Sequence, residues 1–123
     1  MAESFGPYSV ARTTDTLLFI SGQVGINAKD KSVPKGITGQ TRNVLTNIKR
    51  ILTSEGLAME NIVKATVFIT DMDNFSTMNE EYVRHFPQIK PARSCVAVKE
   101  LPRVGGNTPI LVEIEVIVNR GSK

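Results

Sequence analysis

The chain contains no tryptophan, a single cysteine (Cys95) and a single histidine (His85). A lone cysteine cannot form an internal disulfide, which favours a reducing compartment, and so few soft ligands without clustered carboxylates disfavour a zinc site. No apolar run is long enough to span a membrane, and no basic run reaches five residues. We therefore expect no membrane association, no metal and no dedicated nucleic-acid surface.

The length and charge of the chain point to one small globular domain. It has 123 residues and a formal net charge of +3, so a single domain over residues 1–123 is expected. The first residues, Met1 to Pro7, lack a basic region followed by an apolar run, so no secretory signal is expected. The expected compartment is the cytoplasm, with the mitochondrion as the alternative.

Hydrophobic periodicity predicts two helices. The apolar positions Val44, Leu45, Ile48, Ile51 and Leu52 form one stripe on a helix over Thr38–Glu55, and Gly56 is a natural stop. A second helix is predicted to begin at Asp73 or Asn74 and to end at Pro87. Its expected buried stripe consists of Phe75, Met78, Tyr82 and Phe86.

Runs of β-branched and aromatic residues predict the strands. They are expected at Tyr8–Ala11, Leu17–Ser21, Ile62–Thr70, Ala92–Val98 and Ile110–Val118, with a brief one near Val33. Both faces of Ile62–Thr70 are largely apolar, which indicates a central strand. The predicted fold class is therefore α+β: one mixed, mostly antiparallel sheet with both helices packed on one face.

The strand Ala92–Val98 carries an arginine beside small residues. Alternation places Arg93, Cys95 and Ala97 on one face. A guanidinium held in such a socket matches a planar anion such as a carboxylate, because its N–H donors form a fork. The same pattern also fits an arginine at a strand end in a surface salt bridge.

The last strand carries two acids on one face. Glu113 and Glu115 alternate with Ile114 and Val116. If this strand formed an antiparallel hairpin with Ala92–Val98, Arg93 would lie roughly opposite Glu113 or Glu115. A shielded carboxylate there could act as a general base or hold a water molecule, whereas a solvated one would form only a cross-strand salt bridge.

Four further sites have both a functional and a structural interpretation. Ser21-Gly22 follows an apolar strand, where glycine permits close approach to a ligand or simply forms a turn. Cys95 is better explained as a small buried residue than as a nucleophile. His85, at a helix end, is better explained as a surface or capping residue than as a catalyst. Asn79 lies beside the apolar stripe of its helix and needs a partner or a cleft.

Several short motifs occur in order over residues 6–119. They are Gly6-Pro7-Tyr8-Ser9, Phe19-Ile20-Ser21-Gly22-Gln23, Gln40 with Asn47-Ile48, Val63-Lys64-Ala65-Thr66-Val67-Phe68, Asp71-Met72 with Phe75 and Asn79–Tyr82, Pro91-Ala92-Arg93-Ser94, Leu101-Pro102 and Glu113-Ile114-Glu115. Each is short, but the ordered combination is specific. The set resembles the RidA (YjgF) family of reactive imine and enamine deaminases.

The resemblance implies a chorismate-mutase-like fold and a homotrimer with clefts between neighbouring subunits. It also implies hydrolysis of 2-imino and enamino acids, such as 2-aminoacrylate and 2-iminobutyrate. The products would be 2-keto acids and ammonia, and neither a cofactor nor a metal would be used. Arg93 would bind the substrate carboxylate, and Glu113 rather than Glu115 would position or activate the attacking water. The pocket wall would be completed by Tyr8, Ser21, Gly22, Asn79 and Cys95.

The chain departs from the family pattern in two loops. Arg103–Pro109 is longer than the usual turn before the last strand, and Ala28 to Lys31 replace a proline and a Thr-Gly pair.

Two other functions stay open. One is a ligand-binding regulatory module of the same fold without catalysis, although such members lose the arginine. The other is an RNA-acting translation inhibitor or endoribonuclease, which should show a basic track or stacking aromatics.

Overall fold

A computed structural model describes residues 6–104 and 106–121. Short 3₁₀ turns at Met59–Asn61 and Met72–Asn74 precede the third strand and the second helix. Along the chain the elements are β1 (Ala11–Thr13), β2 (Leu17–Val24), α1 (Ile37–Ser54), β3 (Ile62–Ile69), α2 (Phe75–Val83), β4 (Ala92–Ala97) and β5 (Val112–Asn119).

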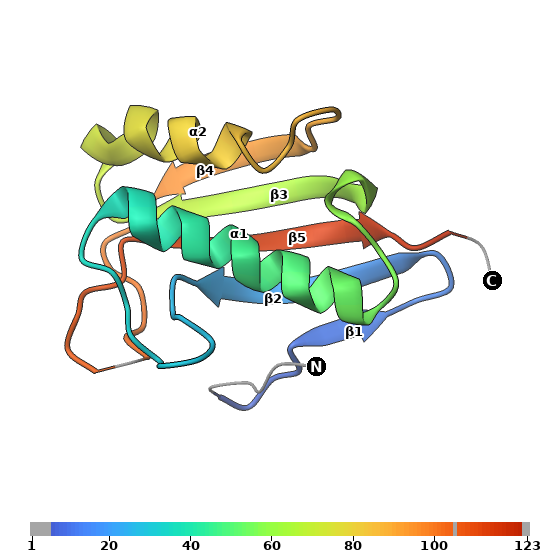
Figure 1. Ribbon diagram of the computed structural model, residues 1–123, viewed down its shortest axis with the longest axis horizontal. Coiled ribbons are helices and arrows are strands. Elements are labelled where there is room, and N and C mark those ends of the chain that lie inside the picture. The colour runs from blue at the N-terminus through green and yellow to red at the C-terminus, as the bar shows by residue number, and fades with distance from the viewer. Residues whose placement is uncertain (1–5, 105, 122–123) are drawn as a thin grey trace.

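Within the described residues, one five-stranded sheet has the order β1-β2-β5-β3-β4. β3 and β4 run parallel, and the other neighbours are antiparallel. Both helices cover the same face of this sheet (Figure 1). The predicted α+β class, the mixed sheet and the helices on one face are confirmed. Each helix connects two parallel strands: α1 joins β2 to β3, and α2 joins β3 to β4.

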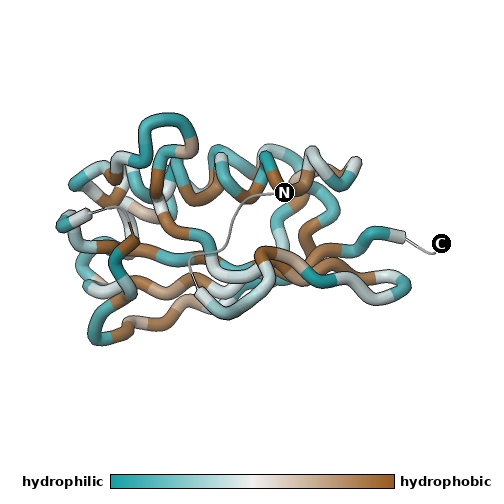
Figure 2. The backbone as a smooth tube through the Cα atoms, turned by 90° about the horizontal axis from the view of Figure 1, so that it is seen from below, coloured by the Kyte–Doolittle hydropathy of each residue, from teal (hydrophilic) through white to brown (hydrophobic). Residues whose placement is uncertain are grey.

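α1 forms where the apolar stripe predicts it. Its inward side is fully buried against the sheet, and hydrophobic and hydrophilic segments alternate along the helical part of the tube in Figure 2. The helix ends in a Schellman motif: Gly56 adopts φ 73° and donates its N–H to Thr53, while Leu57 donates to Leu52 at 2.9 Å. The positive φ explains why glycine follows this helix.

The side chains of β5 alternate between the two faces of the sheet, as predicted. Val112, Ile114, Val116 and Val118 are buried under the helices. Glu113 and the residues two and four positions after it therefore face the other side, which we call the open face because neither helix covers it. β3 lies inside the sheet between β5 and β4, which confirms its prediction as a central strand.

The expected hairpin between the arginine strand and the last strand is wrong. β4 pairs in parallel with β3, so that Arg93 lies beside Ala65, and β5 is inserted between β2 and β3. The physical reason is the α2 crossover, which returns the chain parallel to β3 at the sheet edge. Both edges of β5 are already paired, so β4 has no place beside it.

The first strand also differs from its prediction. β1 covers Ala11–Thr13 instead of Tyr8–Ala11. Its ladder with β2 starts at a tight turn, where Thr14 donates its N–H to the Leu17 carbonyl at 2.8 Å and Leu17 donates to the Thr14 hydroxyl. The hydrogen bonds of this turn set the register between β1 and β2. The alternation of apolar residues in the sequence does not reveal these bonds.

Two smaller predictions are corrected. The segment around Val33 forms no strand in the described structure, because the Asn27 and Asp30 side chains accept backbone N–H bonds and turn the chain there. Phe75 is 36% exposed instead of buried, because it opens α2 above the edge strand. The other members of its predicted stripe, Met78, Tyr82 and Phe86, are buried.

Candidate active site

The predicted site residues fall into two groups on opposite faces of the sheet. Two positions of β3 show this. The partner of Arg93 is the buried Ala65, whereas the partner of Glu113 is Phe68, which lies three residues further along and therefore points to the other face. On the helix side lie Arg93, Asn79 and Cys95. On the open face, around one cavity, lie Tyr8, Ser21, Gly22 and Glu113.

Arg93 is held from above by α2. Its Nη1 donates a hydrogen bond to Oδ1 of Asn79 at 2.7 Å. Its guanidinium carbon lies 4.8 Å from the ring centroid of Tyr82 and 5.7 Å from that of Phe75. Within the described residues no carboxylate forms an ion pair with this arginine. The side chain is therefore a partly buried cation that can bind an external anion.

Cys95 lies two residues after Arg93 on the same face and is partly buried. Burial raises the pKa of its thiol, and the nearby Arg93 charge opposes that shift without cancelling it. Only the thiolate is a good nucleophile. The protonated thiol therefore disfavours a role for Cys95 as a nucleophile.

Glu113 borders a cavity of about 330 Å³ on the open face. The polar wall of this cavity includes Ser21, Gly22 and Glu115. Its apolar wall is formed by Val10, Val24, Ile26, Pro102 and Val104. The cavity thus combines two carboxylates, those of Glu113 and Glu115, with a hydrophobic lining, an arrangement typical of small-molecule sites.

Gly22 makes room for the Glu113 carboxylate. A Cβ atom on Gly22 would overlap the carboxylate oxygen and carbon of Glu113. The neighbouring Ser21 does not point its hydroxyl freely into the cavity but donates it to the Ser9 carbonyl at 2.6 Å. The absence of a side chain at Gly22 therefore lets the Glu113 carboxylate pack directly against this position of β2.

The environment of Glu113 favours its protonated form. Burial raises the pKa of Glu113, and the like charge of Glu115 on the same face raises it further. A carboxyl group with a raised pKa can accept a proton in one step and return it in the next. The electrostatics of the cavity therefore suit acid–base chemistry at Glu113.

Two buried amides of α1 hold the segments that frame this cavity. Asn47 donates from Nδ2 to the carbonyls of Val24 and Ile26 at 3.0 and 2.9 Å. Gln40 donates to the carbonyl of Pro109 and accepts the N–H of Leu111, just before β5. These bonds satisfy otherwise unpaired backbone groups and tie the end of β2 to the start of β5.

Sequence reasoning missed part of each group. The rings of Phe75 and Tyr82 were treated as core residues, although their spacing of four and three from Asn79 places all three on one side of α2. The apolar cavity wall was missed because a register shift in β2 between Ile20 and Gln23 is not visible in the sequence.

The long loop before β5 contributes to the cavity. Val104 lies in its wall, and Arg103 closes the loop with a hydrogen bond to the Asn107 carbonyl at 3.2 Å. Gly105, which belongs to this loop, lies outside the described residues. Across the part of the chain that the structure describes, no group of three His, Cys, Asp or Glu side chains could hold a metal ion, and no helix is long and apolar enough to cross a membrane.

The fold and the two groups define a small α+β protein with a partly buried arginine, which pairs with no carboxylate of the described residues, and an acid beside an apolar cavity. Residues 1–120 match the family described as Endoribonuclease L-PSP. The chain belongs to this family, in which RidA and YjgF proteins are placed, and the predicted family is thereby confirmed.

Named relatives cover almost the whole chain. A protein of Bos taurus named 2-iminobutanoate/2-iminopropanoate deaminase is 41% identical over 119 residues, which are 96% of this chain and 83% of the relative. The crystal structure of Escherichia coli TdcF with bound serine has a TM-score of 0.88 and 36% identity, covering 96% of this chain and 91% of that one. The E. coli YjgF gene product has a TM-score of 0.85 and 34% identity, covering 96% and 91%.

Proposed function

We propose that the protein hydrolyses reactive 2-imino and enamino acids to 2-keto acids and ammonia, without a cofactor. The observation that carries this proposal is the combination of a partly buried arginine that has no acidic partner in the described residues and a carboxyl group with a raised pKa beside a cavity. The name of the bovine relative supports the reaction, and the serine bound to TdcF supports a ligand of amino-acid size.

Each group has a defined chemical task. The fork of Arg93 binds the substrate carboxylate, which fixes the imine carbon in the cleft. Glu113 accepts a proton from a water molecule while the water oxygen attacks that carbon, which is already electrophilic. The proton then passes to the nitrogen, which gives a carbinolamine. Glu113 next takes the proton of the new hydroxyl group and returns it to the nitrogen, so that the C–N bond breaks, ammonia leaves and the carbonyl forms. An enamine first takes a proton on carbon and becomes the imine.

The two groups act on one molecule in an assembly. We place the reaction in a homotrimer whose clefts join Arg93 of one subunit to Glu113 of its neighbour, because within one chain they face opposite sides of the sheet. The open face supports this assembly: Phe19 and Val96 are exposed there at 41% and 43%. A second copy of the chain would cover these apolar side chains.

The test combines turnover with mass. An amino-acid oxidase generates the imine in the presence of purified protein, ammonia release is followed, and light scattering gives the mass. We expect turnover by a trimer, and loss of turnover but not of the trimer in Arg93→Ala. Arg84→Ala, which removes a highly exposed arginine from α2, is the matched control and should remain active.

The outcome also separates the alternative functions. Binding of a 2-keto acid without imine turnover would favour the regulatory module over the enzyme. Tight RNA binding that weakens steeply with salt would favour the RNA-acting protein. Full activity of Arg93→Ala would contradict the proposed reaction site.

A further inference from the structure

We propose that Phe75, Asn79 and Tyr82 of α2 form a cradle that sets the orientation of the Arg93 guanidinium, and that these three are positioning residues for the bound carboxylate. The inference rests on the proposed function, since it assigns Arg93 the role of binding substrate. It goes beyond that function because it assigns the orientation of the carboxylate-binding arginine to side chains on one face of α2.

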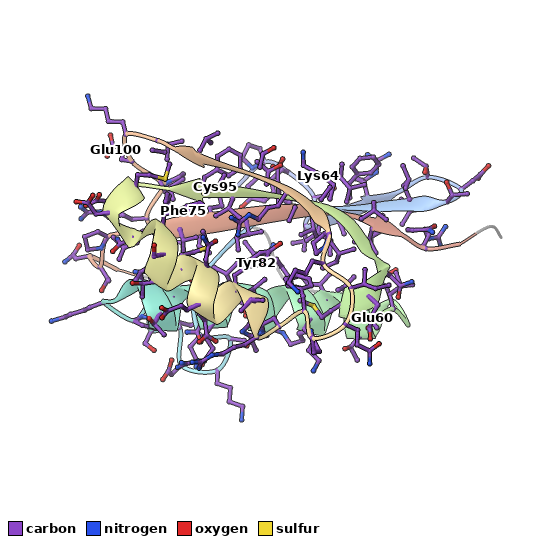
Figure 3. The ribbon with its side chains drawn as sticks, turned by 90° about the horizontal axis from the view of Figure 1, so that it is seen from above. Glu60, Lys64, Phe75, Tyr82, Cys95 and Glu100 are labelled. Carbon is purple, nitrogen blue, oxygen red and sulfur yellow. The ribbon has the colours of Figure 1, made fainter. Side chains whose placement is uncertain are left out.

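The spacing of the three residues creates the cradle. Positions 75, 79 and 82 are four and three residues apart, so they lie on one side of a helix. Figure 3 shows Phe75 and Tyr82 on the α2 side of the sheet and Lys64 on the other side. Both rings reach the guanidinium, at 5.7 and 4.8 Å from their centroids, and the Asn79 oxygen lies 2.7 Å from Nη1.

The cradle holds the charge of Arg93 without neutralising it. Aromatic faces attract a guanidinium through their quadrupole, and an amide oxygen accepts one N–H, but none of these groups carries a negative charge. Within the described residues only Nη1 of Arg93 donates a hydrogen bond. The Nη2 and Nε donors are therefore left to bind the two oxygens of a carboxylate side by side.

The buried acid of α2 is engaged elsewhere. Glu81 is 4% exposed and accepts hydrogen bonds from Arg42 at 3.3 Å and from His85 at 3.0 Å. It also lies 3.7 Å from Arg84. The helix thus keeps its carboxylate with other cations and presents rings and an amide to Arg93, a separation that leaves the arginine charge for a ligand.

The ring of Tyr82, not its hydroxyl, carries this role. Its hydroxyl is buried and has no hydrogen-bond partner among residues 6–104 and 106–121. Burial raises its pKa to about 12 against the opposing charge of Arg93. Such a hydroxyl stays neutral and makes no bond to the guanidinium. Removing the oxygen should therefore leave function intact, whereas removing the ring should not.

The experiment measures KM and kcat for 2-iminobutyrate and the affinity for 2-oxobutyrate by calorimetry. Phe75→Leu and Tyr82→Leu should each raise KM and the dissociation constant about fivefold, the size of one cation–π contact, with little change in kcat. Tyr82→Phe should match the wild type within about twofold, since it keeps the ring. Asn79→Ala should also raise KM, because it releases Nη1.

A stability control separates positioning from packing. Phe86 packs against Tyr82, with ring centroids 4.8 Å apart, but makes no ring contact with Arg93. Phe86→Leu should lower the melting temperature and leave KM unchanged. If Tyr82→Leu fails to fold, Phe75→Leu decides the question, because Phe75 is partly exposed and its loss costs little core packing.

Failure of the cradle and failure of the proposed function give different results. If Arg93→Ala abolishes binding of 2-oxobutyrate while Phe75→Leu and Tyr82→Leu bind it like the wild type, the cradle is wrong and the function stands. If Arg93→Ala still binds and turns over substrate, the proposed function is wrong.

Discussion

Arg93 and Glu113 lie on opposite faces of the same sheet. Arg93 stands on the edge strand β4 and contacts α2, whereas Glu113 stands on β5 and borders the cavity of the open face. Two groups arranged in this way cannot bind one small molecule within a single chain. Because the proposed reaction uses both, it requires that a neighbouring chain bring the second group.

Mixed assemblies test this requirement. Arg93→Ala and Glu113→Gln subunits are each expected to be inactive alone. When the two variants are unfolded together and refolded in equal amounts, each mixed trimer contains one cleft with both native groups. Random mixing should then restore about a quarter of the wild-type activity, measured as ammonia release.

The control for this experiment is a mixture of the folded variants that is never allowed to exchange subunits. It should stay inactive. An absence of recovery after refolding, while light scattering shows mixed trimers, would contradict a site shared between chains. Recovery near the wild-type level would equally contradict it, since only one cleft in each mixed trimer is complete.

The faces of β5 and the limits of α1 could be predicted from the sequence because they depend on local periodicity. Burial repeats every two residues in a strand and every 3.6 in a helix. The sequence therefore separates Glu113 from the buried face of β5, and it places Val44 on the buried side of α1. The partner of a strand is not local information. The pairing of β4 with β3 depends on the α2 crossover, which no alternation pattern in Ala92–Ala97 records.

The candidate site shows the same division. The residue types Arg93 and Glu113 could be selected from the sequence, and the resemblance chose Glu113 over Glu115. Their placement on opposite faces could not be predicted, because it depends on strand order. Likewise, the sequence left Gly22 open as a turn or as a point of close approach to a ligand. The group that packs against it, the Glu113 carboxylate, comes from a strand about 90 residues later and is visible only in the structure.

Gly22 therefore provides a test of the acid's position. In Gly22→Ala the new methyl group occupies the place of the Glu113 carboxylate, which must move. We expect kcat to fall by about a hundredfold, because a displacement of about 1 Å is enough to spoil the reacting geometry. Steady-state kinetics measure this loss, and the melting temperature should change little because the carboxylate is the free end of a flexible side chain.

Gly36→Ala is the matched control for this substitution. A Cβ on Gly36 would meet nothing within 4 Å, and its φ of −96° suits any residue. This variant should keep wild-type kinetics. Wild-type kcat in Gly22→Ala would show that the position of Glu113 does not matter for the reaction.

Removal of Glu115 should shift the pH dependence of the reaction. Burial and the Glu115 charge both raise the pKa of Glu113. Because the base form is needed, activity should fall as the pH drops through this raised pKa. Glu115→Gln removes one of the two causes, so the acidic limb of kcat/KM should move to lower pH. Glu60→Gln, which removes the same charge from the turn before β3, should leave the acidic limb of kcat/KM at the wild-type pH. If Glu115→Gln also leaves this limb unchanged, the group that titrates in the pH profile is not Glu113.

The Glu81 cluster should stabilise the fold in a pH-dependent way. Burial opposes ionisation of Glu81, but hydrogen bonds from His85 and Arg42 outweigh it and lower its pKa below the ordinary 4.5. A lowered pKa in the folded state stabilises the protein above the ordinary value and ceases to do so as the pH falls through the lowered one. Glu81→Gln should therefore reduce the free energy of unfolding by about 1–2 kcal/mol at neutral pH, a modest loss because Arg42 and Arg84 regain solvent.

Urea unfolding at one protein concentration measures this difference, and Glu80→Gln is the control because Glu80 is the exposed neighbour on the same helix. The gap between wild type and Glu81→Gln should begin to shrink as the pH falls below the ordinary 4.5 and should be lost once the pH has fallen through the lowered pKa, where the carboxylate is protonated in both states. A gap that stays constant with pH would mean that Glu81 stabilises the protein by packing and not by its charge. A gap no larger than that of Glu80→Gln would mean that the cluster contributes nothing, as is common for exposed ion pairs.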